Sequence, residues 1–105
     1  MITAISKNGV PIRLTAERWQ HITIGHPDIA DYFYEILETI ENPEIIYEGV
    51  NDAKIAVRMF QDRNNKFVVT VYKESTATDG FVIIAYFSTR KQEFQKKKVL
   101  WKQQM

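Results

Sequence analysis

The sequence contains no cysteine, and this absence excludes disulfide bonds and zinc sites built on thiolates. A chain without cysteine is compatible with a reducing compartment, so we expect a cytoplasmic protein. The sequence also lacks an apolar run of about 18 residues, so no membrane-spanning helix is expected. Its opening, "MITAISKNGVP", does not combine a basic start with a long apolar run as a signal peptide would.

Histidine is scarce as well, because the only two histidines lie in one stretch, "HITIGHPDIA", at residues 21–30. A spacing of five places His21 and His26 roughly 140° apart on a continuous helix, whereas helices that bind zinc use a spacing of four. The helix is also expected to break before Pro27, because a residue that precedes proline avoids helical backbone angles. With no third histidine and no cysteine, we predict no metal site and no cofactor.

Acidic and basic residues are nearly balanced, with a net charge of +1, but they are unevenly distributed. Residues 15–52 contain nine acids against one base, a net charge of −8. Residues 53–105 contain eleven bases against four acids, a net charge of +7. One part of the chain would therefore attract a polyanion that the other part would repel. The alternative is a polar surface on which the two parts attract each other.

The first part of the chain predicts a short strand and two helices. The strand is expected at residues 2–7. Thr15 is a suitable N-cap for a first helix that ends at Gly25. Pro27 suits the first turn of a second helix, in which apolar residues recur at helical spacing as far as Asn42.

The second part predicts strands, because apolar and β-branched residues alternate with polar ones in four stretches: residues 44–49, 53–60, 66–73 and 81–88. The tail from Thr89 to Met105 is expected to form a loose helix on which Phe94 and Trp101 dock together. Helices followed by hairpin-connected strands predict an α+β fold, with two N-terminal helices packed on one face of a four-stranded antiparallel sheet. A short N-terminal strand and a C-terminal helical tail complete this prediction.

The pleat of each strand fixes which residues share a face of the sheet. One choice of orientation places Val57, Val69 and Ile83 against the helices. The opposite face then displays polar and aromatic side chains, namely Arg58, Thr70, Tyr72, Tyr86 and Ser88.

The two histidines differ in their local setting. His21 lies within the first helix, where a structural role is expected. His26 lies at the junction of the two helices, where neighbouring groups can change its protonation state within the physiological range. The alternatives for His26 are a functional imidazole and a residue that only caps the turn.

Three motifs stand out: a helix that carries R-W-x-H-I, an H-P-acid turn, and a strand end with the pattern A-Y-x-[ST]-x-R/K. Together with "ETIENPEIIYEG" and "KKKVLW", they resemble the small phage-associated nucleases of the barnase–EndoU–colicin–RelE superfamily. The resemblance runs from Arg13 to Trp101. It implies a single nuclease domain over residues 1–105, a helix–helix–four-strand fold and metal-independent cleavage of RNA. Toxin-like or phage-conflict roles are common in the wider superfamily.

The resemblance also implies a set of site residues. His26 matches the histidine of the H-P-acid turn, and Arg58 matches the basic position of the second strand. The polar end of the last strand corresponds to Tyr86, Ser88 and Thr89, followed by Arg90 and Lys91. Relatives often have arginine at the position of Gly25 and threonine at the position of Ile84, so this chain lacks two polar groups of the implied site.

Metal-independent RNA cleavage uses the 2′-hydroxyl of the substrate as the nucleophile. His26 is the candidate for proton transfer, because an imidazole titrates near neutral pH. Arg58 or Arg90 would bind the phosphate through paired N–H bonds, and a hydroxyl from Tyr86, Ser88 or Thr89 would bind a non-bridging oxygen. The residues predicted to bind the rest of the substrate are His21, Tyr72, Lys73, Arg90 and Lys91.

Each of these assignments has an alternative. Arg58 would instead cover a sheet edge or pair with an acid, and the two tyrosines would be ordinary strand aromatics. The run Lys96–Lys98 is either a solvated face or a tail that attracts phosphate. At the level of function, the alternative to an endoribonuclease is a non-catalytic RNA-binding or protein-interaction module. A third hypothesis is a regulatory protein whose acidic helix meets a basic partner, and an antitoxin or inhibitor is a further expected partner of a toxin-like nuclease.

Overall fold

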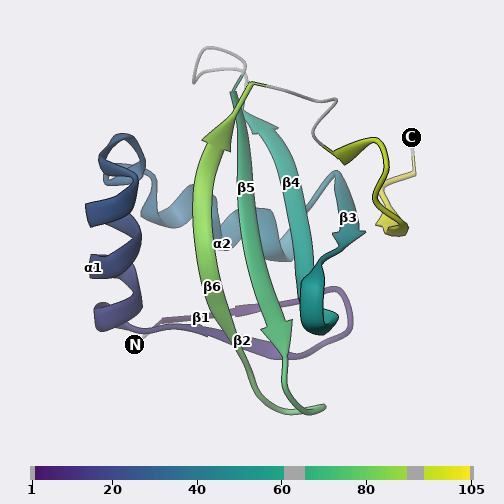
Figure 1. The fold of residues 1–105 in the computed structure, drawn as a ribbon. Coiled ribbons are helices and arrows are strands. Elements are labelled where there is room, and N and C mark those ends of the chain that lie inside the picture. Colours follow the sequence, from purple (N-terminus) through teal and green to yellow (C-terminus); the bar gives the residue numbers. More distant parts are fainter. Residues whose placement is uncertain (1, 61–65, 90–93, 105) are drawn as a thin grey trace.

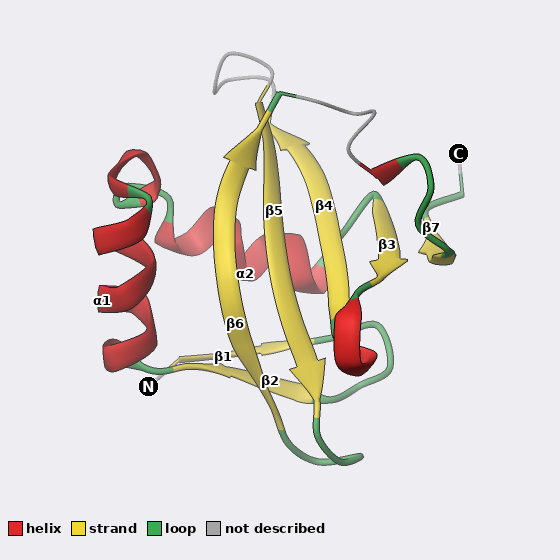
Figure 2. Cartoon of the chain, in the orientation of Figure 1, coloured by secondary structure: helices red, strands yellow, loops and turns green. Residues whose placement is uncertain are grey.

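The computed structural model of the protein describes residues 2–60, 66–89 and 94–104, and this part of the chain forms two α-helices and a seven-stranded mixed sheet (Figures 1 and 2). The helices are α1 (Ala16–Gly25) and α2 (Phe33–Glu41), with short 3₁₀ turns η1 (Pro27–Ile29) and η2 (Val50–Asp52). The strands are β1 (Ile2–Ile5), β2 (Pro11–Leu14), β3 (Ile45–Glu48), β4 (Lys54–Phe60), β5 (Lys66–Glu74), β6 (Gly80–Ser88) and β7 (Val99–Lys102). Their order in the sheet is β1-β2-β6-β5-β4-β3-β7.

The four predicted strands are present as β3 to β6, and neighbours among them are antiparallel. The prediction of a four-stranded antiparallel sheet is nevertheless wrong, because a hairpin of β1 and β2 extends it. β2 pairs in parallel with the start of β6, through Ile12 with Gly80 and Arg13 with Phe81. Proline is tolerated at the first position of a strand, so Pro11 did not prevent this pairing.

The predicted C-terminal helical tail is also wrong, because residues 99–102 form β7 and pair antiparallel with β3. Two backbone hydrogen bonds extend the pairing, from Glu48 N to Lys98 O (2.8 Å) and from Gln103 N to Glu44 O (2.8 Å). Phe94 and Trp101 do not dock together. Phe94 stacks on Tyr47, with ring centroids 5.1 Å apart, whereas Trp101 pairs with Ile46 and packs against the main hydrophobic core. Edge pairing with β3 outweighs the weak helical pattern of this segment.

The first helix begins and ends as predicted. Thr15 is its N-cap and accepts a hydrogen bond from Arg18 N (3.1 Å). The second helix does not run on from Pro27, because the chain forms the separate turn η1 before α2 starts at Phe33. This break allows Ile29 in η1 and Ile36 in α2 to be fully buried together.

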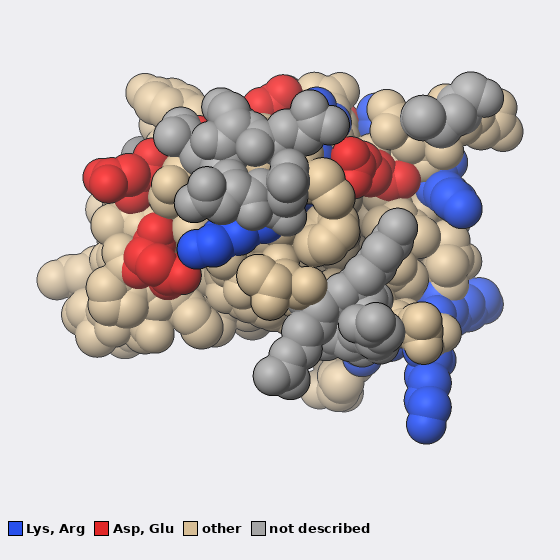
Figure 3. Space-filling view, turned by 90° about the horizontal axis from the view of Figure 1, so that it is seen from above, with Lys and Arg blue, Asp and Glu red and all other residues tan. Residues whose placement is uncertain are grey.

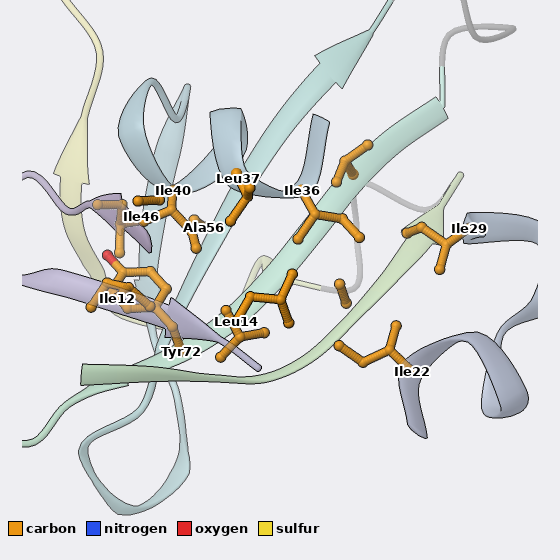
Figure 4. Close-up of a cluster of buried hydrophobic side chains, with 14 of the residues drawn as sticks. Ile12, Leu14, Ile22, Ile29, Ile36, Leu37, Ile40, Ile46, Ala56 and Tyr72 are labelled. Atoms are coloured by element: carbon orange, nitrogen blue, oxygen red, sulfur yellow. The ribbon is translucent and has the colours of Figure 1, made fainter. Parts of the chain in front are cut away.

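The main core lies between α2, the inner face of the sheet and the β1–β2 hairpin, which crosses near the lower ends of β5 and β6 in Figure 1. Figure 4 shows the aliphatic side chains that converge there, among them Ile12, Leu14, Ile36, Ile40 and Ala56. No helix in the described part of the chain is long and apolar enough to cross a membrane.

The predicted orientation of the sheet is wrong for β4 and β5, although Tyr86 and Ser88 of β6 do lie on the face opposite α2 as predicted. Thr70 and Tyr72 face α2, and Thr70 Oγ1 donates a hydrogen bond to Ile36 O (3.2 Å). Val57 and Val69 belong to a second apolar cluster on the opposite face. Both faces of these strands are apolar, so the alternation of residue types could not distinguish them. We call the face opposite α2 the open face; it is lined by Ile45, Tyr47, Ile55, Val57, Phe67, Val69, Val71 and Tyr86.

Candidate functional site

His26 lies between α1 and η1, and backbone hydrogen bonds hold it from both sides. Its N–H donates to Ile22 O (2.8 Å), which closes α1, and its carbonyl accepts from Ile29 N (3.1 Å), which opens η1. Its backbone angles, φ −136° and ψ 75°, are not helical, as expected for a residue before proline. The junction therefore turns the partly exposed imidazole away from the axis of α1.

The His26 ring stacks on Tyr86 of β6, with ring centroids 5.7 Å apart and an interplanar angle of 29°. Buried Ile22 and Ile29 anchor α1 and η1 against β6 and so fix the distance between the two rings. Stacking occupies a face of the imidazole and leaves its nitrogens at the ring edge. Among the described residues, neither nitrogen makes a hydrogen bond. The arrangement presents an oriented imidazole beside the open face.

The polar end of β6 continues from Tyr86. Ser88 points to the same face of the sheet as Tyr86, about 7 Å further along the strand, and it is only 7% exposed. Thr89 follows as an exposed residue just after the strand. Arg90 and Lys91, predicted to bind the substrate, lie outside the described residues. The structure thus brings His26, Tyr86, Ser88 and Thr89 to one end of β6.

Arg58 does not join this group. It belongs to the inner face of β4, where Nη1 donates to Asn42 O (2.8 Å) after α2 and the guanidinium lies over the Phe60 ring at 5.4 Å. Its Nε is buried and has no hydrogen-bond partner among the described residues. Because the sheet separates Arg58 from Tyr86, the guanidinium cannot meet the same phosphate as His26.

Tyr72 is also excluded from the site, because it is 1% exposed in the main core. Burial, together with the nearby charge of Glu74, raises the pKa of its hydroxyl far above the usual value. A ring in this position cannot stack on a nucleobase.

The remaining predicted residues lie further away. His21 is exposed on α1. Lys73 is on the open face near the lower end of β5, four residues from Val69, the partner of Tyr86. Four strand residues correspond to about 13 Å. Lys73 therefore shares the face of the site but not its centre.

Two pockets on the open face were not predicted. One, of about 280 Å³, lies over β3, β4 and β5 and is lined by Glu44, Ile45, Tyr47, Val57, Met59, Phe67, Phe94 and Lys102. The other, of about 510 Å³, lies lower on the sheet and is lined by residues that include Lys73, Lys97, Asn51 and Phe81. The lysine run at 96–98 was the only sequence signal for the second pocket.

Figure 3 views the end of the molecule that carries the upper ends of β4, β5 and β6. The visible Lys and Arg side chains gather mainly on the side of the C-terminal segment, and Asp and Glu mainly on the side of the helices. On this face, the charge asymmetry of the sequence therefore has a spatial counterpart. Within the described ranges, no group of three or more His, Asp or Glu side chains is arranged to hold a metal ion.

A family model described as phage-Barnase-EndoU-ColicinE5/D-RelE like nuclease2 matches residues 3–102, nearly the whole chain. The resemblance inferred from the H-P-acid turn and the end of the last strand is thereby confirmed. No curated protein and no solved structure matches the chain.

Proposed function

The chain belongs to this family of phage-associated nucleases, and from that premise we propose that it is a metal-independent endoribonuclease that cleaves RNA across its open face. One observation carries the proposal: the imidazole of His26 is held against Tyr86 at the edge of the open face. An oriented imidazole can exchange a proton near neutral pH and needs no metal ion to do so.

In the proposed reaction, the 2′-oxygen attacks the adjacent phosphorus and the bond to the leaving 5′-oxygen breaks. His26 transfers one of the two protons involved, either from the 2′-hydroxyl or to the 5′-oxygen. Tyr86 keeps the imidazole in place, and the hydroxyl of Ser88 or Thr89 donates to a non-bridging oxygen. Arg90 and Lys91 directly follow these hydroxyls in the sequence and supply positive charge for the phosphate.

The open face supplies a surface for the rest of the RNA. Phe81 is 37% exposed at the lower end of β6, and Tyr86 lies on the same face. Stacking of a base on an aromatic side chain typically contributes about 1–3 kcal/mol. Lys73 and Lys97 line the intervening pocket and would contact the phosphates between stacked bases.

A non-catalytic RNA-binding module is the second candidate. It is favoured by Gly25 and Ile84, which stand where relatives often have arginine and threonine. Ile84 is 36% exposed on β6, and no atom lies within 4 Å of where a Cβ on Gly25 would be, so no other side chain occupies the space beside Gly25. Such a module would bind RNA through the same lysines without cutting it.

Cleavage of labelled total RNA in EDTA tests the proposal, with His26→Ala as the variant and His21→Ala as the matched control. We expect the wild-type protein and His21→Ala to cut RNA, and His26→Ala to lose about 10²–10⁴-fold in rate, the usual contribution of a positioned proton donor or acceptor.

Other outcomes contradict the proposal. Cleavage that disappears in EDTA would refute metal independence, and equal activity of His26→Ala would refute the role of the imidazole. Salt-sensitive RNA binding without cleavage would establish the second candidate. Binding to a basic protein with no affinity for RNA would point to a regulatory role for the acidic helix α2.

A further inference from the structure

We propose that the 280 Å³ pocket over β3, β4 and β5 binds a nucleobase of the RNA, and that Glu44 selects bases with an exocyclic amino group over uracil. The inference rests on the proposed ribonuclease function, because it assigns a specificity to the same open face.

The position of the pocket places it next to the cleavage centre. Tyr86 on β6 pairs with Val69 on β5, and Val69 pairs with Val57, which lines the pocket. Adjacent strands are about 4.8 Å apart, so Val57 lies about 10 Å from Tyr86 across the sheet. Tyr86 and the pocket residue Phe67 both pack against the same apolar cluster on this face. A nucleotide adjacent to the cleaved phosphate can therefore reach the pocket.

The lining of the pocket suits a flat heteroaromatic ring. Tyr47 and Phe94 stack on each other with an interplanar angle of 19°, and Phe67 and Met59 add apolar surface. Apolar and aromatic walls with a few polar groups are typical of sites that read an unstacked base by its edge.

Glu44 is the acidic residue of this lining, and backbone contacts hold it in place. Its N–H donates to Val57 O (2.9 Å), and its carbonyl accepts from Gln103 N (2.8 Å). Its carboxylate oxygen Oε1 accepts from Met59 N (3.1 Å), while Oε2 accepts no hydrogen bond from any described residue. The side chain of this lining residue is therefore held through Oε1, while Oε2 remains an acceptor that no described residue uses.

A carboxylate acceptor discriminates between bases by the hydrogen-bond donors that their edges carry. Adenine, cytosine and guanine each carry an amino group that can donate to Oε2. Uracil has no amino group, and its one donor on this edge, N3–H, is flanked by two carbonyl oxygens that a carboxylate repels. Lys102 lines the same pocket and can donate to a ring nitrogen or carbonyl beside the amino group. A single unfulfilled hydrogen bond to a charged group in such a site is enough to lower affinity by about tenfold or more.

The test uses proteins that all carry His26→Ala, so that the RNA stays intact. Binding of the oligonucleotides (rA)5, (rC)5 and (rU)5 is measured for this parent, for Glu44→Gln in it, and for Glu48→Gln in it. Glutamine at residue 44 keeps an oxygen that can accept from Met59 N, and its amide N–H can donate a hydrogen bond to a carbonyl oxygen of uracil. Glu48 is the last residue of β3, the strand that begins directly after Glu44; it is exposed and does not line the pocket, so its variant controls for the loss of one negative charge.

We expect the parent to bind (rA)5 and (rC)5 at least about tenfold more tightly than (rU)5. We expect Glu44→Gln to reduce this ratio to less than about twofold and Glu48→Gln to preserve it. Backbone amide shifts in NMR spectra with (rA)5 should centre on Ile45, Val57 and Phe67.

The inference would be overturned by no preference in the parent, by a preference that survives Glu44→Gln, or by chemical shifts that map elsewhere. Loss of the preference in both variants would assign it to net charge and would also overturn it. Failure of the wild-type protein to cleave RNA would refute the proposed function alone, because the binding ratio is measured without cleavage.

Discussion

At the scale of single residues, the contact between His26 and Tyr86 can be tested by substitutions that separate the role of the tyrosine ring from that of its hydroxyl. Tyr86→Phe retains the stacked ring, whereas Tyr86→Leu removes the support that orients the imidazole. We expect Tyr86→Leu to lower kcat for RNA cleavage by about tenfold or more, since small displacements of catalytic groups are costly, and Tyr86→Phe to lower it less. Equal losses in steady-state assays of the two variants would assign the effect to the hydroxyl and contradict the positioning role.

The environment of Glu74 makes the free energy of unfolding depend on pH. Burial raises the pKa of its carboxyl, but hydrogen bonds from Ser6, Asn8 and Lys54 and the charge of Lys54 outweigh burial, so the pKa lies below its usual value. The carboxylate therefore stabilises the fold above the unfolded-state pKa of about 4.3, and this contribution is lost as the pH falls through the lowered pKa.

We expect Glu74→Gln to reduce the free energy of unfolding by about 1–2 kcal/mol at pH 7 and by much less at pH 3. Urea denaturation at both pH values measures the difference. The exposed Glu48→Gln is the control and should change little at either pH. A loss of stability that is the same at pH 7 and pH 3 would show that the charge of Glu74 is not responsible.

At the scale of elements, the parallel junction of β2 with β6 requires glycine at residue 80. A Cβ there would lie 2.5 Å from both Ile12 Cδ1 and the backbone oxygen of Lys73. The backbone oxygen cannot move without breaking the β5–β6 ladder. We expect Gly80→Ala to destabilise the protein by about 1–3 kcal/mol in thermal or urea unfolding.

Gly25→Ala is the matched control, because a Cβ at the end of α1 meets no atom within 4 Å. Alanine is favoured over glycine in helices, so this variant should be neutral or slightly stabilising. If Gly80→Ala were as stable as Gly25→Ala, the close approach of β2 to β6 would not exist in solution.

Elements with long local patterns could be predicted from the sequence, and those defined by distant pairing could not. β4 to β6 alternate over seven to nine residues, and Thr15 marks the start of α1 by its own side chain. β2 and β7 have four residues each and depend on partners far away in the chain. Such short segments carry too little local signal to outweigh a helical or loop prediction.

The candidate site, like the fold, could be predicted only in part from the sequence. His26 follows from the helix boundary that Pro27 imposes, and Tyr86 from the polar end of the last strand. Arg58 was assigned to the wrong face because both faces of β4 are apolar enough to be buried. Glu44 could not be found, and Lys97 was indicated only as part of a lysine run, because their pockets exist only once β3, β5 and the C-terminal segment meet.

At the scale of the whole molecule, the distribution of positive charge predicts how RNA binding responds to salt. Each phosphate contact on a single strand contributes a slope of about −0.7 in log K against log salt concentration. We expect Lys73→Ala and Lys97→Ala each to reduce the magnitude of the slope by about 0.7 when binding is titrated in the His26→Ala background. Lys7→Ala is the control, because Lys7 lies over Trp101, away from the open face, and should leave the slope unchanged.

An unchanged slope in both lysine variants would remove the lower part of the open face from the RNA path. A reduced slope in Lys7→Ala as well would indicate diffuse attraction by net charge. In either case the assignment of His26 would stand or fall on the cleavage assay alone.

The pairing of β2 with β6 also bears on the order of assembly. The two strands are joined by more than sixty residues of chain, whereas β4, β5 and β6 follow one another as hairpins. Closing so long a loop costs entropy that only a nearly formed sheet can offset, so we expect the N-terminal hairpin to dock late in folding. The loss of stability in Gly80→Ala should then appear as a faster unfolding rate, with the refolding rate almost unchanged. We therefore expect the N-terminal hairpin to be the first part of this protein to separate on unfolding.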